Sequence, residues 1–230
     1  MRHALPLAAT LCLLTALPAH AGRPLQAEDA GILDARQCEL EGAWARLREP
    51  ALPRATERGL QVACGIGWNS QLALATSRAS VADLNGQALR LGGKTALFQT
   101  AGQDPTSVTL AWGISSAKVA DAGWEHVATD LNAVASTPLG PYTLHLNLGH
   151  ERDAQARAGT TTWAVALEHE GVGGLAPMGE FFGDDRGAPW WNLGLRWTAV
   201  PEKAFVDLSY GRQIASGRPA LLTAGFKLVF

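Results

Sequence analysis

The last twelve residues of the chain constrain its fold more than any other stretch. Counting back from Phe230 in steps of two gives only apolar residues as far as Leu222. The intervening positions include Lys227, Gly225 and Thr223. Because successive side chains of a β-strand point to opposite faces, this segment has one wholly apolar face and one face that carries a charge. The pattern predicts a final β-strand that turns one face toward an apolar phase.

Segments with the same period of two recur after residue 37 and predict an all-β fold. Twelve strands are expected, and ten is kept as an alternative because the third and fourth segments are the weakest. An even number is typical of a single-chain transmembrane antiparallel β-barrel. The third and seventh connections, which contain SRASVADLNG and HERDAQARAG, are expected to be polar outer loops. The expected strands are 38–47, 58–68, 70–78, 87–98, 106–116, 123–135, 141–150, 160–170, 174–183, 189–199, 203–212 and 220–230.

The first residues have the features of an exported protein. Residues 1–21 combine a short positive start, an apolar core and a cleavage site with small residues at Ala19 and Ala21, as a secretory signal peptide does. Cys12 lies inside that apolar core and is discarded with it. These features predict removal of residues 1–21 on export.

The next stretch differs from both the signal peptide and the strands. Residues 22–37 show no alternation and mix charges with Pro and Gly, so this N-terminal segment is expected to be irregular. The barrel domain is then 38–230. Residues 23–34 form either a periplasmic tail or a plug in the lumen, and a tail is the preferred interpretation.

Composition agrees with a barrel in the bacterial outer membrane. Hydrophobic residues make up 47% of the chain and charged residues 17%, yet no stretch beyond residue 21 reaches the roughly 18 apolar residues of a membrane helix. Alternation dilutes the lipid-facing surface of a barrel in this way. The formal net charge of −2 gives no basic excess for nucleic-acid binding. Outer-membrane lipids and lipopolysaccharide are the expected partners. A soluble sandwich or lipocalin would show the same period with the two faces reversed.

The two cysteines of the mature chain are expected to form a disulfide bond. An exported protein meets an oxidising periplasm, which favours a bond between Cys38 and Cys64. If they face each other across a hairpin, its centre falls at residue 51, within the turn-like residues 49–53. A metal pair is the alternative, but no His or Cys lies at ligand spacing from either cysteine. No metal site is predicted.

The polar face of the strands is expected to line the lumen. Acids and bases on that face are roughly balanced and should form pairs, because an isolated buried charge costs several kcal/mol. Along the sixth strand His126, Asp130 and Asn132 are also expected inward. Such a lumen either holds the barrel shape as a salt-bridged plug or forms a polar path for a small solute. The predicted lumen residues are Glu39, Glu41, Arg90, Lys94, His145, Asn147, Glu168, Glu180, Arg196, Asp207 and Lys227.

The tryptophans provide a second test of a membrane barrel. Seven of the eight lie within about four residues of an expected strand end, and Trp112 is the exception. Tryptophans in membrane proteins concentrate at the level of the lipid headgroups. The seven are Trp44, Trp68, Trp124, Trp163, Trp190, Trp191 and Trp197.

The sequence carries no convincing catalytic set, and we expect a protein that is not an enzyme. Nucleophilic catalysis needs a base within hydrogen-bond reach of the nucleophile. His145, beside Asn147, comes nearest, but no serine is tied to it by local spacing. No nucleotide fingerprint or metal-ligand cluster appears, so no cofactor is expected. Residues 150–153 are interpreted as an outer loop that contacts lipopolysaccharide. The candidates considered are His126, His145, His150, His169, Ser107, Ser115, Ser116 and Ser209.

Three short segments carry a resemblance to known barrels. Arg23-Pro24-Leu25, Glu28-Asp29-Ala30-Gly31 and Cys38-Glu39-Leu40-Glu41 resemble the opening of small proteobacterial outer-membrane barrels of uncharacterised role. That group is similar to barrels described as transporters of the phenol-degradation meta-pathway type. The C-terminal aromatic Phe230 also resembles the closing residue of bacterial outer-membrane barrels, which implies recognition by the barrel-assembly machinery.

The resemblance implies passage of small molecules, hydrophobic ones included. The sequence therefore predicts a narrow outer-membrane channel or transporter of unknown cargo. The alternative is a non-transporting structural or surface-interaction barrel whose lumen is sealed by ion pairs.

Overall fold

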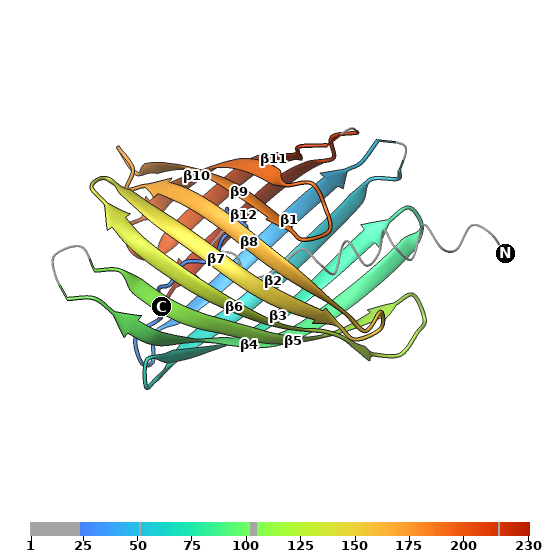
Figure 1. Ribbon diagram of the computed structural model, residues 1–230, viewed down its shortest axis with the longest axis horizontal. Helices are drawn as coiled ribbons and strands as arrows, with labels where there is room; N and C mark the ends of the chain where they lie inside the picture. The colour runs from blue at the N-terminus through green and yellow to red at the C-terminus, as the bar shows by residue number, and fades with distance from the viewer. Residues whose placement is uncertain (1–23, 51, 102–104, 216) are drawn as a thin grey trace.

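The computed structural model describes residues 24–50, 52–101, 105–215 and 217–230, so the predicted signal peptide lies outside the described residues. Twelve antiparallel strands form one closed barrel in which each strand pairs with its sequence neighbours and β1 pairs with β12 (Figure 1). The predicted twelve-stranded all-β barrel is confirmed, and the ten-strand alternative is wrong. The strands are β1 (Cys38–Arg48), β2 (Ala55–Gly67), β3 (Ser70–Val81), β4 (Leu84–Gln99), β5 (Ser107–Val119), β6 (Glu125–Leu139), β7 (Tyr142–Asp153), β8 (Ala158–His169), β9 (Leu175–Asp184), β10 (Trp190–Val200), β11 (Ala204–Gln213) and β12 (Ala220–Val229).

The barrel closes where the first and last strands meet. Cys38 and Phe230 exchange two backbone hydrogen bonds, with N···O distances of 2.8 and 2.9 Å. In the same ladder Phe226 lies opposite Gly42, and its ring covers the space that a Cβ would occupy there. We call the end of the barrel that carries Cys38 and Phe230 the terminal end, and the opposite end the distal end.

The disulfide bond also lies at the terminal end. Cys38 and Cys64 are direct partners in the β1–β2 ladder, with their Cα atoms 4.1 Å apart. The predicted bond is confirmed. The bond ties the first residue of β1 to β2. The N-terminal segment therefore joins the barrel next to a covalent crosslink.

Two connections are shorter than the sequence predicts. Strands β3 and β4 are joined by Ala82 and Asp83 alone, and Ala82 has a φ of 50°. Strand β7 continues through residues 150–153, which were expected to form an outer loop. The predicted loops at 77–86 and 150–153 are therefore wrong. The strands continue into polar sequence, because a strand end that lies outside the hydrocarbon needs no apolar face.

The exterior of the barrel is apolar, and buried charges lie inside. Leu148 and Leu193 are 62% and 63% exposed, whereas Glu180 and Asp207 are each 3% exposed. A water-soluble barrel would show the reverse arrangement. An exterior of this kind fits the hydrocarbon of a membrane. Among the described residues, no helix is long and apolar enough to cross a membrane.

Candidate functional site

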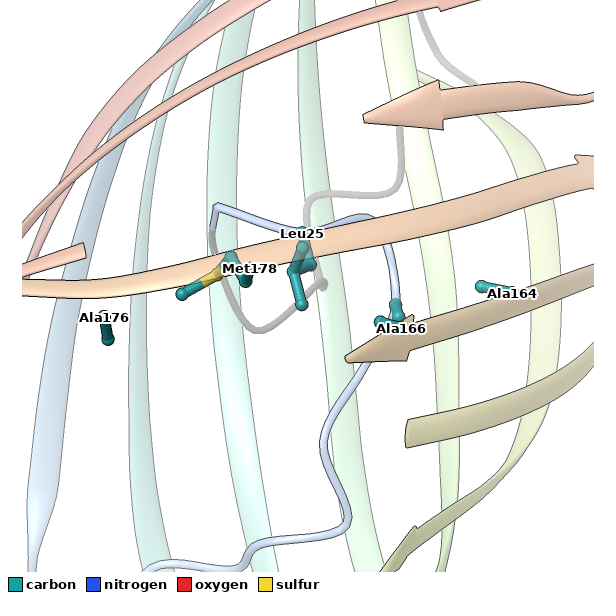
Figure 2. Close-up of a cluster of buried hydrophobic side chains, with 6 residues drawn as sticks. Leu25, Ala164, Ala166, Ala176 and Met178 are labelled. Carbon is teal, nitrogen blue, oxygen red and sulfur yellow. The ribbon is translucent and has the colours of Figure 1, made fainter. Parts of the chain in front are cut away.

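The N-terminal segment, residues 24–37, enters the lumen. Leu25 is 2% exposed and packs inside the barrel in a cluster with small side chains of β8 and β9 (Figure 2). The preferred interpretation of this segment as a periplasmic tail is therefore wrong, and the alternative of a lumen plug is right. Small inward residues of the wall leave the space that the segment fills. The cluster consists of Leu25, Ala27, Ala164, Ala166, Ala176 and Met178.

The segment is bound to the wall first through Glu180 of β9. The two carboxylate oxygens of Glu180 accept hydrogen bonds from the backbone amides of Gln26 and Ala27, at 2.7 and 2.8 Å. The side-chain amide of Asn192 on β10 donates to Glu180 Oε1 at 2.8 Å and to the Pro24 carbonyl at 3.2 Å. Glu180 therefore pairs with backbone donors and an amide, and no basic residue is its partner in any ion pair within the described part of the chain.

Asn147 of β7 binds the next residue of the segment on both sides. Its Oδ1 accepts from the Glu28 amide at 2.8 Å, and its Nδ2 donates to the Glu28 carbonyl at 2.9 Å. This two-sided contact is what one strand offers another across a ladder. A wall side chain here takes the place of a missing neighbouring strand and satisfies a buried backbone.

Three further strands complete the binding of the backbone. Ser136 Oγ of β6 accepts from the Ala30 amide at 2.9 Å, and Thr109 Oγ1 of β5 donates to the Ala30 carbonyl at 2.7 Å. Gln71 Oε1 of β3 accepts from the Leu33 amide at 2.9 Å. With Lys94 of β4, which donates to the Asp29 carbonyl, seven strands contribute side chains to one stretch of backbone, and that stretch crosses the lumen toward the terminal end.

Lys94 of β4 supplies the ionic contact to the segment. Its Nζ lies 2.6 Å from Glu28 Oε1 and 3.8 Å from Asp29 Oδ1, and it donates to the Asp29 carbonyl at 3.1 Å. The sequence placed Lys94 among wall charges that balance one another. In the structure its partners come from the N-terminal segment.

The other predicted charges form pairs within the wall. Lys227 lies 2.7 Å from Glu39 and 3.2 Å from Glu41 at the terminal end. Arg196 donates to Asp207 at 2.9 Å and lies 3.6 Å from Glu168. These two groups bring together seven charged or partly charged residues once His145, 3.7 Å from Glu168, is included. The pairing holds neighbouring strands together on the inner face.

Arg90 reaches across a strand to find its partner. Its guanidinium forms a bidentate pair with Asp130 of β6, although β5 lies between β4 and β6. The space for this reach is provided by Gly113 of β5, where a Cβ would overlap the guanidinium. The glycine therefore permits the ion pair.

His145 has a serine partner that the sequence analysis missed. Ser136 Oγ lies 2.8 Å from His145 Nδ1, because the two residues are direct partners in the β6–β7 ladder. The register of the hairpin at Gly140 would have revealed the pair. His145 is 5% exposed, and Ser136 already binds Ala30 of the N-terminal segment. The arrangement anchors the segment, and the serine hydroxyl is shared between the Ala30 amide and the imidazole.

His126 does not face the lumen as predicted. It is exposed at the start of β6, where its ring contacts the Ser115 carbonyl at 3.1 Å and Thr129 Oγ1 at 3.3 Å. The β5–β6 register shifts at Ser115 and Ser116, and this bulge changes the alternation of side chains. Asp130 and Asn132, beyond the bulge, line the lumen cavity as expected.

A cavity of about 360 Å³ occupies the lumen beside the N-terminal segment. It reaches Glu57 and Asp184 toward the distal end, and its inner boundary includes Gln26, Glu28 and Lys94. Much of its wall is made of alanine and glycine, whose small side chains leave the lumen open. The small residues of β3, β4 and β5 that line it include Ala73, Ala75, Ala79, Ala88, Gly92, Ala111 and Ala117.

An aromatic pair also lines this cavity. The rings of Phe182 and Trp190 are stacked, with centroids 6.0 Å apart and planes 12° from parallel. The expectation that Trp190 lies at the lipid headgroups is therefore wrong, because it faces the lumen. Trp68, at a strand end and 89% exposed, has the exposure expected of a headgroup residue. Among the described residues no group of three or more His, Cys, Asp or Glu could hold a metal ion.

Solved structures with a similar fold include outer-membrane porins and channels. The KdgM porin aligns with a TM-score of 0.60 and 8% identity, over 83% of this chain and 99% of that one. The COG4313 outer membrane channel from Pseudomonas putida F1 gives 0.61 and 12% identity, over 88% and 98%. The fold is therefore that of an outer-membrane β-barrel, in agreement with the predicted location.

The chain belongs to the family described as "Uncharacterised conserved protein UCP029691", whose model matches residues 9–230. No curated protein matches the sequence. The part of the resemblance that is confirmed is an uncharacterised family with an outer-membrane barrel fold.

One structural neighbour is an enzyme. The outer membrane phospholipase A from Escherichia coli aligns with a TM-score of 0.54 and 8% identity, over 88% of this chain and 93% of that one. At that identity the likeness concerns the fold alone. The partly buried Ser136–His145 contact described above is the only serine–histidine hydrogen bond between side chains in the described residues.

Proposed function

We propose that the protein is a narrow outer-membrane channel for small molecules, hydrophobic ones included, whose lumen is constricted by its own N-terminal segment. The cavity of about 360 Å³ carries this proposal. Its volume lies within the range of small-molecule sites, about 300–1,000 Å³. Gln26 and Glu28 line the cavity, so the bound segment narrows the lumen beside it.

The way the segment is bound supports a removable constriction. Its contacts to the wall are hydrogen bonds and the single lysine Lys94, and its apolar anchor is Leu25. Each wall group could exchange the segment for water or solute. The outer-membrane channels among the structural neighbours support the same class of function.

A second candidate is a sealed barrel that transports nothing. The ion pairs of Lys227 and Arg196 and the hydrogen bonds to residues 24–33 favour it, because together they fill one side of the lumen. In this function the barrel would serve the envelope as a structural or surface-interaction protein.

The surroundings follow from the same proposal. Residues 1–21 would be removed on export, residues 22–37 would form the N-terminal segment, and 38–230 would form the barrel. Outer-membrane lipids and lipopolysaccharide would surround it, and Phe230, which is 69% exposed, would serve recognition by the assembly machinery. We propose no catalytic activity, since the Ser136–His145 pair is occupied by the segment.

The test is solute flux through the purified protein in liposomes and planar bilayers. The channel predicts discrete, small conductance steps and uptake of small uncharged solutes that stops as solute size increases. A protein that folds and inserts, yet shows neither conductance nor flux, would be the sealed barrel instead.

A further inference from the structure

The carboxylates that line the cavity outnumber its basic side chains. Five carboxylates line the cavity, against three lysine or arginine side chains. Two of the three basic groups are already bound, Lys94 to Glu28 and Arg90 to Asp130. The third, Lys118, lies 5.4 Å from the ring centroid of Trp124, which is 45% exposed. The carboxylates are Glu28, Glu57, Asp130, Glu151 and Asp184.

Glu151 is the clearest example. It is the direct ladder partner of Asp130, so two carboxylates lie side by side on the inner face of β6 and β7. Arg90 binds Asp130 with both of its terminal nitrogens. Within the described part of the chain, Glu151 takes part in none of the side-chain hydrogen bonds or ion pairs. Two neighbouring carboxylates that have a single guanidinium beside them favour the binding of a further cation.

Asp184 adds a second carboxylate along the same wall. Strands β7, β8 and β9 are neighbours, and Glu151 and Asp184 pair with Thr160 and Thr162 of the intervening strand, which sets their Cα atoms about 12 Å apart. Asp184 Oδ1 accepts from the backbone amides of Arg186 and Gly187 at 2.7 Å, and it belongs to none of the ion pairs between described residues. Thr162 of β8, the ladder partner of Asp184, also lines the cavity.

The apolar part of the site adjoins these carboxylates. Phe182 and Asp184 face the lumen from the same strand, and Phe182 is the ladder partner of Trp190 on β10. Leu47 and Leu221 line the cavity as well. An apolar body could therefore rest on the aromatic and aliphatic wall while a charged head approaches Glu151 or Asp184.

We propose that this cavity is a binding site for a small organic monocation, an amine with an apolar or aromatic body. Placing the head against Glu151 or Asp184 compensates its lost hydration, and the stacked rings offer apolar area and a π-face to the ligand. An anion of the same shape would be repelled by these carboxylates, and two of the three basic side chains of the wall, Lys94 and Arg90, are already bound. The inference deepens the proposed function by naming the solute class, and transport of the amine rests on that function.

The test measures equilibrium binding of three probes of one shape to the detergent-solubilised full-length mature protein by titration calorimetry at neutral pH. The probes are 2-phenylethylammonium, 2-phenylethanol and phenylacetate. The cation should bind about tenfold more tightly than the alcohol, which is about 1.4 kcal/mol, and the anion more weakly than the alcohol. Equal binding of cation and alcohol, tighter binding of the anion, or no binding of any probe would overturn the proposal.

Variants then locate the site. Glu151→Gln should reduce the affinity for the cation about fivefold or more and leave the affinity for the alcohol unchanged. Glu170→Gln, which changes an exposed carboxylate in the β8–β9 connection at the terminal end, should change neither. Unchanged cation binding by Glu151→Gln would refute the assigned head site. If this variant does not fold, Asp184→Asn takes its place and should likewise weaken binding of the cation alone. The three-probe series on the unaltered protein tests the proposal without any variant.

The outcome is separable from that of the proposed function. A protein that binds the amine but shows no conductance would keep the site and lose the channel. A protein that conducts but binds no amine would keep the channel and lose the site.

Discussion

Glu180→Gln should release the N-terminal segment from the barrel wall. The wild-type carboxylate accepts three hydrogen bonds, two from the Gln26 and Ala27 amides and one from Asn192. Glutamine keeps the shape of the side chain but offers only one acceptor oxygen. Its NH2 group must then face a donor, whichever way the amide is turned.

The magnitude follows from these bonds. Loss of one charge-assisted bond costs about 1.5–3 kcal/mol, and the remaining bonds weaken because the acceptor is neutral. The total is about 3 kcal/mol for the bound state of the segment. Since about 1.4 kcal/mol is a factor of ten, the population of the released segment should rise about a hundredfold.

Amide hydrogen exchange in detergent micelles measures this change directly. The amides of Gln26 and Ala27 should exchange about a hundredfold faster in the variant, and the strand amides should keep their protection. Glu170→Gln, in an exposed connection, should exchange as the unaltered protein does. If the Gln26 and Ala27 amides keep their wild-type protection in Glu180→Gln, then the carboxylate does not hold the segment and the reasoning fails.

Three further perturbations test the barrel itself. Leu195→Arg, on the lipid-facing side, should lower the free energy of unfolding in urea by about 2–4 kcal/mol, while Leu195→Phe should leave it nearly unchanged. Gly113→Ala should force the guanidinium that lies over this glycine out of its ion pair and cost about 1–3 kcal/mol, whereas Gly123→Ala, with open space around it, should be neutral. Replacing both Cys38 and Cys64 by serine should cost about 3 kcal/mol, from the loop that their separation of 26 residues closes. Equal unfolding free energies within either matched pair, or for the disulfide-free and disulfide-bonded proteins, would contradict the corresponding argument.

The barrel could be predicted because its signal is local. Alternation is a property of each strand by itself, so the pattern that ends at Phe230 indicates a strand without knowledge of its partner. The same argument fails where strands leave the membrane. Residues 79–81 and 84–86 continue β3 and β4, although Ser80, Asn85 and Gly86 give this stretch the sequence pattern of a loop.

The charged lumen could be predicted only in part. Because an isolated buried charge is costly, Lys227 and Arg196 were expected to have acidic partners, but this argument does not identify those partners. Arg90 passes over a glycine to a strand two places away, and that choice depends on the register of three strands. Register is set by the whole sheet, so single-strand patterns carry no information about it.

The position of the N-terminal segment could not be predicted because its contacts to the barrel wall are not local. Gln26 and Glu180 are 154 residues apart, and the other wall contacts of residues 27–33 come from strands throughout the first three quarters of the chain. An extended segment with no period gives no sign of the surface that binds it. A single polar residue of the wall, such as Asn147, does not indicate a binding surface by itself. The surface is recognisable only when the polar residues of several strands are seen together.

The small residues of the wall link the segment and the cavity. Inward alanines of β8 and β9 make room for Leu25, and inward alanines and glycines of β3, β4 and β5 leave the opposite side of the lumen open. A twelve-stranded barrel with larger inward side chains would fill its own interior and need no segment. The sequence therefore specifies an interior that the wall alone does not fill, with a segment held by polar contacts on one side and a cavity rich in carboxylates on the other. This combination supports the channel that we propose, because a barrel serving only as a rigid support would need neither.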